Sequence, residues 1–279
     1  MNGKPDGIFR ILHFSDVHLG LRDFHAAYLL DKRFFGRLNQ FVTRQCRLRQ
    51  DALALFLDLL QSRAADFLLC TGDLTSIGSQ EEFHHVEERL KPILEASQGR
   101  FLFVPGNHDA YIKGCQTDLQ EAFNRLNGGR LRYDELPALL PCGPVEFVVL
   151  NPARPCRIWQ STGELTEVAW KKLDYILQKP CAKGKSRIVV SHFPLCDHRG
   201  KPLSWRTKFL QGERLLAHAA AGHFDALATG HVHHPFVQPL PGAENVLAIG
   251  AGSLTLFGCC AQIDVHPNTG KLIAETIIT

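Results

Sequence analysis

The chain has 279 residues, of which 45% are hydrophobic, and its formal net charge at pH 7 is +3. This charge is too small to indicate a nucleic-acid or membrane partner, and no run is apolar enough to span a bilayer. The nine cysteines are scattered and the first residues lack a signal-peptide core, so we expect a single reduced, cytoplasmic domain over 1–279.

Short apolar runs in the chain predict buried strands, and a polar motif follows each of them. The runs lie at 9–14, 66–70, 101–104 and 187–190. The motifs are Asp16-Val17-His18, Gly72-Asp73, Gly106-Asn107-His108-Asp109 and Ser191-His192, with a fifth, Gly230-His231-Val232-His233, farther along the chain. Because loops beyond the carboxyl ends of strands converge on one crevice, these polar residues can meet in space.

The first two motifs are separated by more residues than one crossover helix needs, which predicts an insertion at about 21–51. Residues 32–49 contain six basic residues, no acidic one and apolar residues at helical spacing. This basic amphipathic helix has two interpretations. It packs on the sheet with its arginines in water, or it caps the site, where Phe34 and Phe35 contact an acyl chain or 32–49 rests on an anionic membrane.

Three further helices are predicted from apolar spacing and capping residues. They are 52–60, 80–95 with Ser79 as its N-cap, and 166–178 with Thr166 as its N-cap. We interpret them as packing helices without a direct functional role.

The segment 196–206 is predicted to be a loop, followed by a helix at 211–221. Arg199 and Arg206 could bind a phosphate group through paired hydrogen bonds, and Trp205 could stack on a base. The alternative is a solvated loop. After the fifth motif, consecutive strands completing the second sheet are predicted at 246–249, 254–257, 262–265 and 272–278.

The five motifs contain side chains that suit divalent metals. Two ions need roughly eight protein contacts, and a carboxylate can bridge them because its oxygens can serve both. With no cysteine in the motifs, we expect two divalent ions, manganese before iron or zinc. Outside the motifs, His198 is interpreted as a solvated or core residue, whereas His234 is left open because it neighbours a motif. The candidate metal ligands are Asp16, His18, Asp73, Asn107, His192, His231 and His233.

Read in order, the motifs DxH, GD, GNH(D/E), H and GHxH resemble the signature of the calcineurin-like metallophosphoesterases over residues 16–233. The resemblance implies an α/β fold of two facing mixed sheets flanked by helices, an αββα sandwich with the metals at the sheet edge. It also implies two ligand sets that share Asp73 as the bridge. One set is Asp16, His18, Asp73 and His233, and the other is Asp73, Asn107, His192 and His231.

The resemblance further implies that His108 is not a ligand. It would act as a general acid or donor at the leaving-group oxygen, which suits an imidazole with a pKa near about 6.5. Asp109 is a candidate for orienting that imidazole.

The chemistry predicted from these residues is hydrolysis of a phosphodiester or pyrophosphate bond, by in-line attack of a hydroxide that bridges two ions. We expect first a lipid-linked substrate such as UDP-2,3-diacylglucosamine of lipid A synthesis, because the pyrophosphatases that it resembles pair this metal site with a helical cap. The best-known branch of those enzymes has arginine where this chain has His108. This reading would place 32–49 against the inner face of a membrane.

Two alternatives to a lipid-linked substrate stay open. One is a cyclic-nucleotide or other soluble phosphodiesterase, and the other is a non-catalytic scaffold of the same fold, although no ligand is missing. A nucleic-acid substrate is not expected because there is no appended basic domain. The sequence gives no indication of the oligomeric state.

Overall fold

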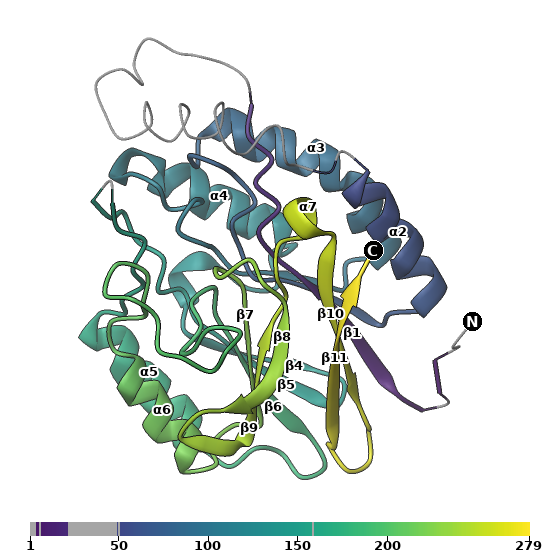
Figure 1. The fold of residues 1–279 in the computed structure, drawn as a ribbon, viewed down its shortest axis with the longest axis vertical. Helices are drawn as coiled ribbons and strands as arrows, with labels where there is room; N and C mark the ends of the chain where they lie inside the picture. Colours follow the sequence, from purple (N-terminus) through teal and green to yellow (C-terminus); the bar gives the residue numbers. More distant parts are fainter. Residues whose placement is uncertain (1–3, 6, 22–48, 50, 158) are drawn as a thin grey trace.

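The computed structural model describes residues 4–5, 7–21, 49, 51–157 and 159–279 (Figure 1). Most of the predicted insertion at about 21–51, with the helix over 32–49 and the side chains of Phe34 and Phe35, lies outside the described residues.

A five-stranded mixed sheet carries the first three motifs. Its β1, β2 and β3 are parallel, whereas β10 runs antiparallel to β1 and β11 antiparallel to β10. In spatial order the strands are β11 (Leu272–Ile278), β10 (Cys259–Val265), β1 (Phe9–Phe14), β2 (Phe67–Cys70) and β3 (Phe101–Phe103).

A six-stranded mixed sheet carries the last two motifs. Its four central strands are parallel and the two edge strands are antiparallel to their neighbours. In spatial order the strands are β4 (Ala138–Cys142), β5 (Val145–Val149), β6 (Ser186–Val190), β7 (Ala226–Thr229), β9 (Ala243–Gly250) and β8 (Phe236–Leu240).

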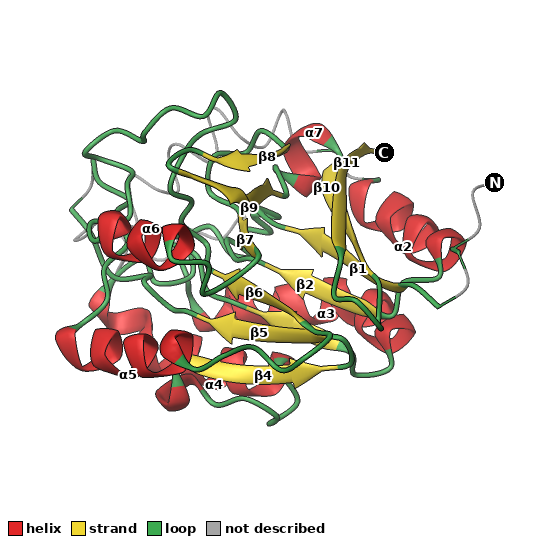
Figure 2. Ribbon diagram, turned by 90° about the horizontal axis from the view of Figure 1, so that it is seen from below, coloured by secondary structure: helices red, strands yellow, loops and turns green. Residues whose placement is uncertain are grey.

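The two sheets face each other and helices cover their outer faces (Figure 2). Phe67 of β2 stacks on Phe147 of β5 with ring centroids 5.1 Å apart, which joins one sheet to the other. On the outer side of the first sheet, Phe14 packs against Phe56 of α2 at 4.8 Å. Strands covered on both faces read as continuous apolar runs, which is why the sequence pattern lacks alternation. The predicted fold of two facing mixed sheets flanked by helices is therefore confirmed.

The four predicted helices that lie in the described residues, α2, α3, α5 and α6, begin and end close to the predicted bounds, and the structure adds α4 and α7. Ser79 and Thr166 cap α3 and α5 as predicted, since each side-chain oxygen accepts a backbone amide hydrogen of the first turn. The helices are α2 (Ala52–Arg63), α3 (Gln80–Ser97), α4 (Gln116–Leu126), α5 (Glu167–Gln178), α6 (Gly212–Ala220) and α7 (Leu254–Phe257), with short 3₁₀ turns at Lys113–Cys115 and Tyr133–Glu135.

Two predictions about the C-terminal part are wrong. Residues 254–257 form helix α7 and not a strand. Ser253 Oγ accepts the amide hydrogen of Leu256 and so caps the helix at its start, whereas Gly258, with a φ of 65°, ends it. The strands after it do not complete the second sheet, since β10 pairs with β1 of the first. Alternation along a strand reports which face is buried, but it does not identify the partner strand.

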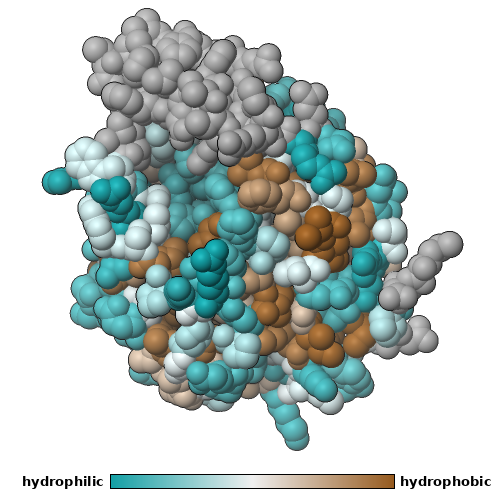
Figure 3. All heavy atoms as spheres, in the orientation of Figure 1, coloured by the Kyte–Doolittle hydropathy of each residue, from teal (hydrophilic) through white to brown (hydrophobic). Residues whose placement is uncertain are grey.

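On the face shown in Figure 3, apolar surface gathers around α7 and the neighbouring ends of β10 and β11 and is interspersed with hydrophilic surface. Phe257 and Ile278 are among the exposed large apolar residues. Within the described ranges, no helix has both the length and the apolar character needed to cross a bilayer.

Candidate metal centre

The five motifs occupy the loops that leave the carboxyl ends of β1, β2, β3, β6 and β7. Backbone hydrogen bonds hold these loops against one another. The amide of Asp16 donates to Gly72 O at 3.0 Å, that of His18 donates to Asp73 O at 2.9 Å, and that of Gly230 donates to His192 O at 3.0 Å. Loops that are far apart in the sequence therefore meet at one edge of the sandwich, as the strand pattern predicts.

One group of candidate ligands consists of Asp16, His18 and His233, whose ligand atoms lie within 4.8 Å of one another. Asp16 Oδ1 is 3.2 Å from His233 Nε2 and 3.7 Å from His18 Nε2, and the two Nε2 atoms are 3.3 Å apart. This cluster of one carboxylate and two imidazoles has the donor atoms that a divalent transition metal prefers.

A second group forms around Asp73 and His192. His192 Nε2 lies 3.4 Å from Asp73 Oδ2 and 3.2 Å from the side-chain oxygen of Asn107. Asp73 Oδ2 is also 4.0 Å from His18 Nε2, so one carboxylate lies within reach of both groups. The position of Asp73 fits the predicted bridge.

His231 lies beside this second group, and its ring centroid is 5.1 Å from that of His192. Burial lowers the pKa of His231 to about 3, so the ring is neutral. Its Nε2 lies 2.9 Å from the carbonyl oxygen of Thr207, which can only accept a hydrogen bond. Nε2 therefore carries the hydrogen and Nδ1 keeps the lone pair that a metal needs.

The electrostatics of the site fit two divalent ions. Asp16 and Asp73 are almost completely buried. Burial alone would raise the pKa of each, but His233 holds the pKa of Asp16 low and His192 and His108 hold the pKa of Asp73 well below its usual value. Among the described residues, Asp16 Oδ1 has no hydrogen-bond donor. Buried, ionised carboxylates next to imidazoles are typical of residues that coordinate metal.

Five of the candidate ligands have a left-handed backbone, which side chains other than glycine rarely adopt. The φ angles are 54° for Asp16, 50° for His18, 53° for Asp73, 72° for His231 and 59° for His233. The two other described non-glycine residues with positive φ are C-caps of helices. Concentrated strain of this kind is typical of a functional site held by its surroundings.

Glycines in the motifs allow the loops to approach each other. A Cβ atom on Gly106 would lie 2.2 Å from Asp73 Oδ1, and one on Gly230 would lie 2.0 Å from Ser15 Oγ. Any side chain at either position would push a candidate ligand loop away. This steric requirement explains the glycines of the GNHD and GHVH motifs.

The segment after β9 supports the first motif from outside it. Ser253 Oγ donates to the carbonyl oxygen of Asp16 at 2.7 Å, and Thr255 Oγ1 donates to that of Val17 at 2.8 Å. The amide of Ser253 also donates to His233 O at 2.8 Å. These contacts connect the DVH and GHVH loops, and the sequence motifs gave no sign of them.

His108 lies at the edge of the site, with its ring centroid 4.9 Å from that of His18. Its Nδ1 is 2.7 Å from the carbonyl oxygen of Ser76. Asp109 does not orient this imidazole as predicted, because its carboxylate accepts hydrogen bonds from Thr75 and from the amide of Gly106. Asp109 therefore joins the GD loop to the GNHD loop, and burial, with the charge of Asp73, raises its pKa to about 7.

A cavity of about 410 Å³ opens onto the candidate ligands. Part of the 196–206 segment forms its wall, but Arg199, Trp205 and Arg206 are exposed and do not line it. His198 does line it, beside His234, with ring centroids 4.6 Å apart. The wall residues are Asp73, Asn107, His108, Ser161, Asp197, His198, Pro202, Leu203, Ser204, Thr207, His231, Val232, His233 and His234.

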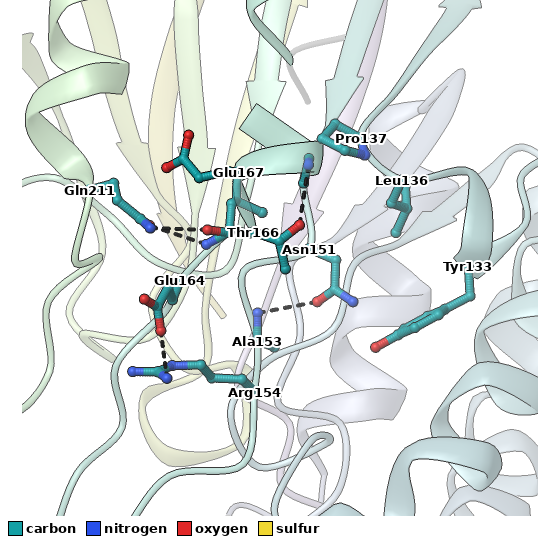
Figure 4. Close-up of a pocket in the computed structure, with 12 residues that line it drawn as sticks. Tyr133, Leu136, Pro137, Asn151, Ala153, Arg154, Glu164, Thr166, Glu167 and Gln211 are labelled. Carbon is teal, nitrogen blue, oxygen red and sulfur yellow. Dashed lines mark hydrogen bonds and ion pairs between the residues drawn. The ribbon is translucent and has the colours of Figure 1, made fainter. Parts of the chain in front are cut away.

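A larger cavity, of about 660 Å³, lies elsewhere and contains none of the candidate ligands (Figure 4). Several polar groups at its wall bond one another. Arg154 pairs with Glu164 at 2.5 Å, and the Gln211 side chain bonds both the amide and the carbonyl of Leu165. Since none of the candidate ligands lines this cavity, its size does not make it the reactive site.

Comparison with known proteins agrees with this arrangement. A family model described as calcineurin-like phosphoesterase matches residues 9–235. No curated protein matches the sequence.

Solved structures share the fold at low sequence identity. A dimetal phosphatase from Danio rerio is similar at a TM-score of 0.62 and 14% identity, over 98% of this chain and 99% of that one. A purple acid phosphatase from yellow lupin seeds is similar at a TM-score of 0.56 and 14% identity, over 97% of this chain and 54% of that one. The NAD nucleotidase of Haemophilus influenzae is similar at a TM-score of 0.50 and 14% identity, over 97% of this chain and 49% of that one.

Proposed function

This chain belongs to the calcineurin-like phosphoesterase family, and we propose that it hydrolyses a small, polar phosphodiester. The observation that carries the proposal is the cavity of about 410 Å³ over the candidate metal ligands, whose described wall is mostly polar and contains no lysine or arginine. Its apolar wall residues are Pro202, Leu203 and Val232, which suit a short organic group and not a long acyl chain.

The charge of the wall favours a diester over a monoester. No lysine or arginine lines the described part of the cavity, and Asp197 adds a carboxylate. A phosphate monoester carries up to two negative charges and a diester one, so the diester needs fewer cationic side chains beside the ions. The uncharged donors Ser161, Ser204 and Thr207 are sufficient partners for a singly charged ester.

We propose that Asp73 is shared by two divalent ions, manganese first. Asp16, His18 and His233 would complete one ligand set, and Asn107, His192 and His231 the other. When bound, such ions neutralise phosphate oxygens and lower the pKa of a water molecule.

The role proposed for His108 is to hold a proton at the leaving-group oxygen. The carbonyl of Ser76 can only accept a hydrogen bond, so Nδ1 of His108 carries a hydrogen and Nε2 is the nitrogen that can exchange a proton with the ester. A positioned imidazole of this kind contributes about 10²- to 10⁴-fold to rates limited by departure of the leaving group.

The lipid-linked substrate expected from the sequence depends on residues 32–49, which lie outside the described residues. It stays a prediction, as does contact of that segment with a membrane. A non-catalytic scaffold is disfavoured by the complete set of seven candidate ligands.

The proposal is tested by activity of metal-free and manganese-loaded protein on four substrates in parallel. These are bis-p-nitrophenyl phosphate, p-nitrophenyl phosphate, cyclic AMP and UDP-2,3-diacylglucosamine. We expect manganese-dependent turnover of at least one small diester and weaker turnover of the monoester. Turnover of the lipid alone, or of the monoester alone, would contradict the proposed substrate class, and no turnover of any ester would contradict the enzymatic function.

A further inference from the structure

The hydrogen bond from His108 to Ser76 depends on a loop that a buried glutamate anchors. We propose that Glu82, in the first turn of α3, is a positioning residue for His108. The inference rests on the leaving-group role proposed above for His108, and it concerns a residue outside all five motifs.

Glu82 is fixed in place by its own surroundings. Its side chain is completely buried, and its backbone amide donates to Ser79 Oγ, the N-cap of α3, at 3.3 Å. Its Oε2 accepts two hydrogen bonds from the loop that precedes the helix, from the amide of Ser76 at 3.0 Å and from that of Ile77 at 2.8 Å.

The second of these bonds acts on the peptide unit that contacts His108. The amide of Ile77 and the carbonyl of Ser76 belong to the same planar peptide group. Glu82 Oε2 binds this group at its N–H, and His108 Nδ1 binds it at its C=O, 2.7 Å away. Fixing the N–H therefore fixes the direction of the carbonyl, and the two hydrogen bonds polarise each other through the peptide.

This chain of contacts sets both the tautomer and the direction of the His108 ring. With Nδ1 held by Ser76, the ring presents Nε2 as the nitrogen that can exchange a proton. The opposite side of the same loop is held by Asp109 through the amide and hydroxyl of Thr75. Asp109 bonds Thr75 but not the Ser76 peptide, so Glu82 is the described side chain that controls the carbonyl.

Two conservative variants of Glu82 test separately whether the position of its acceptor oxygen or the charge of its side chain matters. Glu82→Gln keeps an oxygen at the same distance without the charge, whereas Glu82→Asp keeps the charge and withdraws the oxygen by one methylene. Glu88→Asp, at an exposed position of the same helix, is the matched control. Each variant is assayed with manganese on methyl p-nitrophenyl phosphate, which has a good leaving group, and on methyl phenyl phosphate, which has a poor one.

We expect His108→Ala to lose about 100-fold on the poor leaving group and far less on the good one. Glu82→Asp should show the same selectivity, with a loss of about tenfold or more, because small misplacements of a catalytic group have effects of this size. Glu82→Gln and Glu88→Asp should stay close to the parent protein. The combination of His108→Ala with Glu82→Asp should be no worse than His108→Ala alone, since the two act through one group.

Equal losses on both substrates in Glu82→Asp, or losses that multiply with those of His108→Ala, would overturn the positioning role and leave a purely structural one. If His108→Ala itself lacks selectivity, the proposed role of His108 fails and this inference falls with it. A direct measurement needs no folded Glu82 variant. The ¹⁵N spectrum of the parent protein loaded with zinc, which is diamagnetic, assigned by comparison with His108→Ala, should show His108 protonated at Nδ1, and an unprotonated Nδ1 would refute the proposal.

Discussion

Replacing Asp73 by asparagine tests the shared carboxylate directly. The change should leave the fold intact, because Asp73 Oδ1 accepts the amide of His108 at 2.7 Å and an asparagine oxygen can still accept it. It also removes a charge that repels the carboxylate of Asp16. Because His192 and His108 favour the charged form of Asp73, the metal-free variant should nevertheless lose some stability relative to the metal-free parent, and each protein is compared with its own metal-free form. What it loses is an anionic oxygen within 3.4 Å of His192 Nε2 and 4.0 Å of His18 Nε2.

The size of the effect follows from mass action. At a manganese concentration one hundred times the dissociation constant, each bound ion raises the free energy of unfolding by about 2.7 kcal/mol. Even the removal of a group that only supports a metal ligand weakens binding by about 10- to 100-fold. A hundredfold weaker site, at the same manganese concentration, leaves only about 0.4 kcal/mol of stabilisation per ion. A bridging residue should impose this loss on both ions.

The assay is equilibrium dialysis against manganese with metal analysis, followed by thermal unfolding with and without metal. The parent protein should bind two equivalents and show a large metal-dependent rise in Tm, and Asp73→Asn should lose most of both. Asp58→Asn, at an exposed position of α2, is the control and should behave as the parent. An Asp73→Asn protein that keeps two equivalents and the full rise in Tm would refute the assignment of Asp73 as the bridge.

Three further predictions follow from the geometry. Gly106→Ala should reduce manganese binding, measured by the same dialysis, because its Cβ would lie 2.2 Å from Asp73 Oδ1; unchanged binding would contradict the steric argument. Burial lowers the pKa of His13 to about 3, so only the unfolded state gains its proton as pH falls below the ordinary value. The free energy of unfolding should then fall by up to about 1.4 kcal/mol per pH unit between about 6 and 4, and urea titrations of His13→Gln should lack that part of the slope. Arg187→Met should destabilise the protein by about 3–5 kcal/mol in urea titrations, because it leaves the Glu146 carboxylate, 2.7 Å from Arg187 Nη2, without its buried partner; a loss below about 1 kcal/mol would show that the pair matters little.

The sequence predicted those parts of the fold that local patterns encode. The strands at 9–14 and 187–190 and the caps Ser79 and Thr166 were recognised because burial and capping depend on neighbouring residues in the chain. The helix at 254–257 was not recognised, because an apolar run of four residues fits a strand or a helical turn equally well. Ser253 before the run and Gly258 after it are the local signals of a helix.

The candidate site was predicted where its chemistry is carried by side chains in motifs. Contacts through backbone carbonyls could not be foreseen, since any residue type can supply them, and Ser76 and Thr207 are of this kind. Glu82 lies in the first turn of α3 and outside all five motifs. Its contact with Ser76 and Ile77 depends on how the loop returns over the helix, which no local pattern specifies.

The hydrogen bonds from Ser253 and Thr255 to the loop of Asp16 and Val17 bear on where the chain can be cut. All seven candidate ligands lie before residue 235, where the match to the family model also ends. A fragment that stops there would contain every group thought to touch metal. It would nevertheless lack the two hydroxyls that hold the first loop and the strand β10 that pairs with β1. Such a fragment would retain the ligand residues without the support that brings them together, so the boundary of the motifs is not the boundary of the working unit.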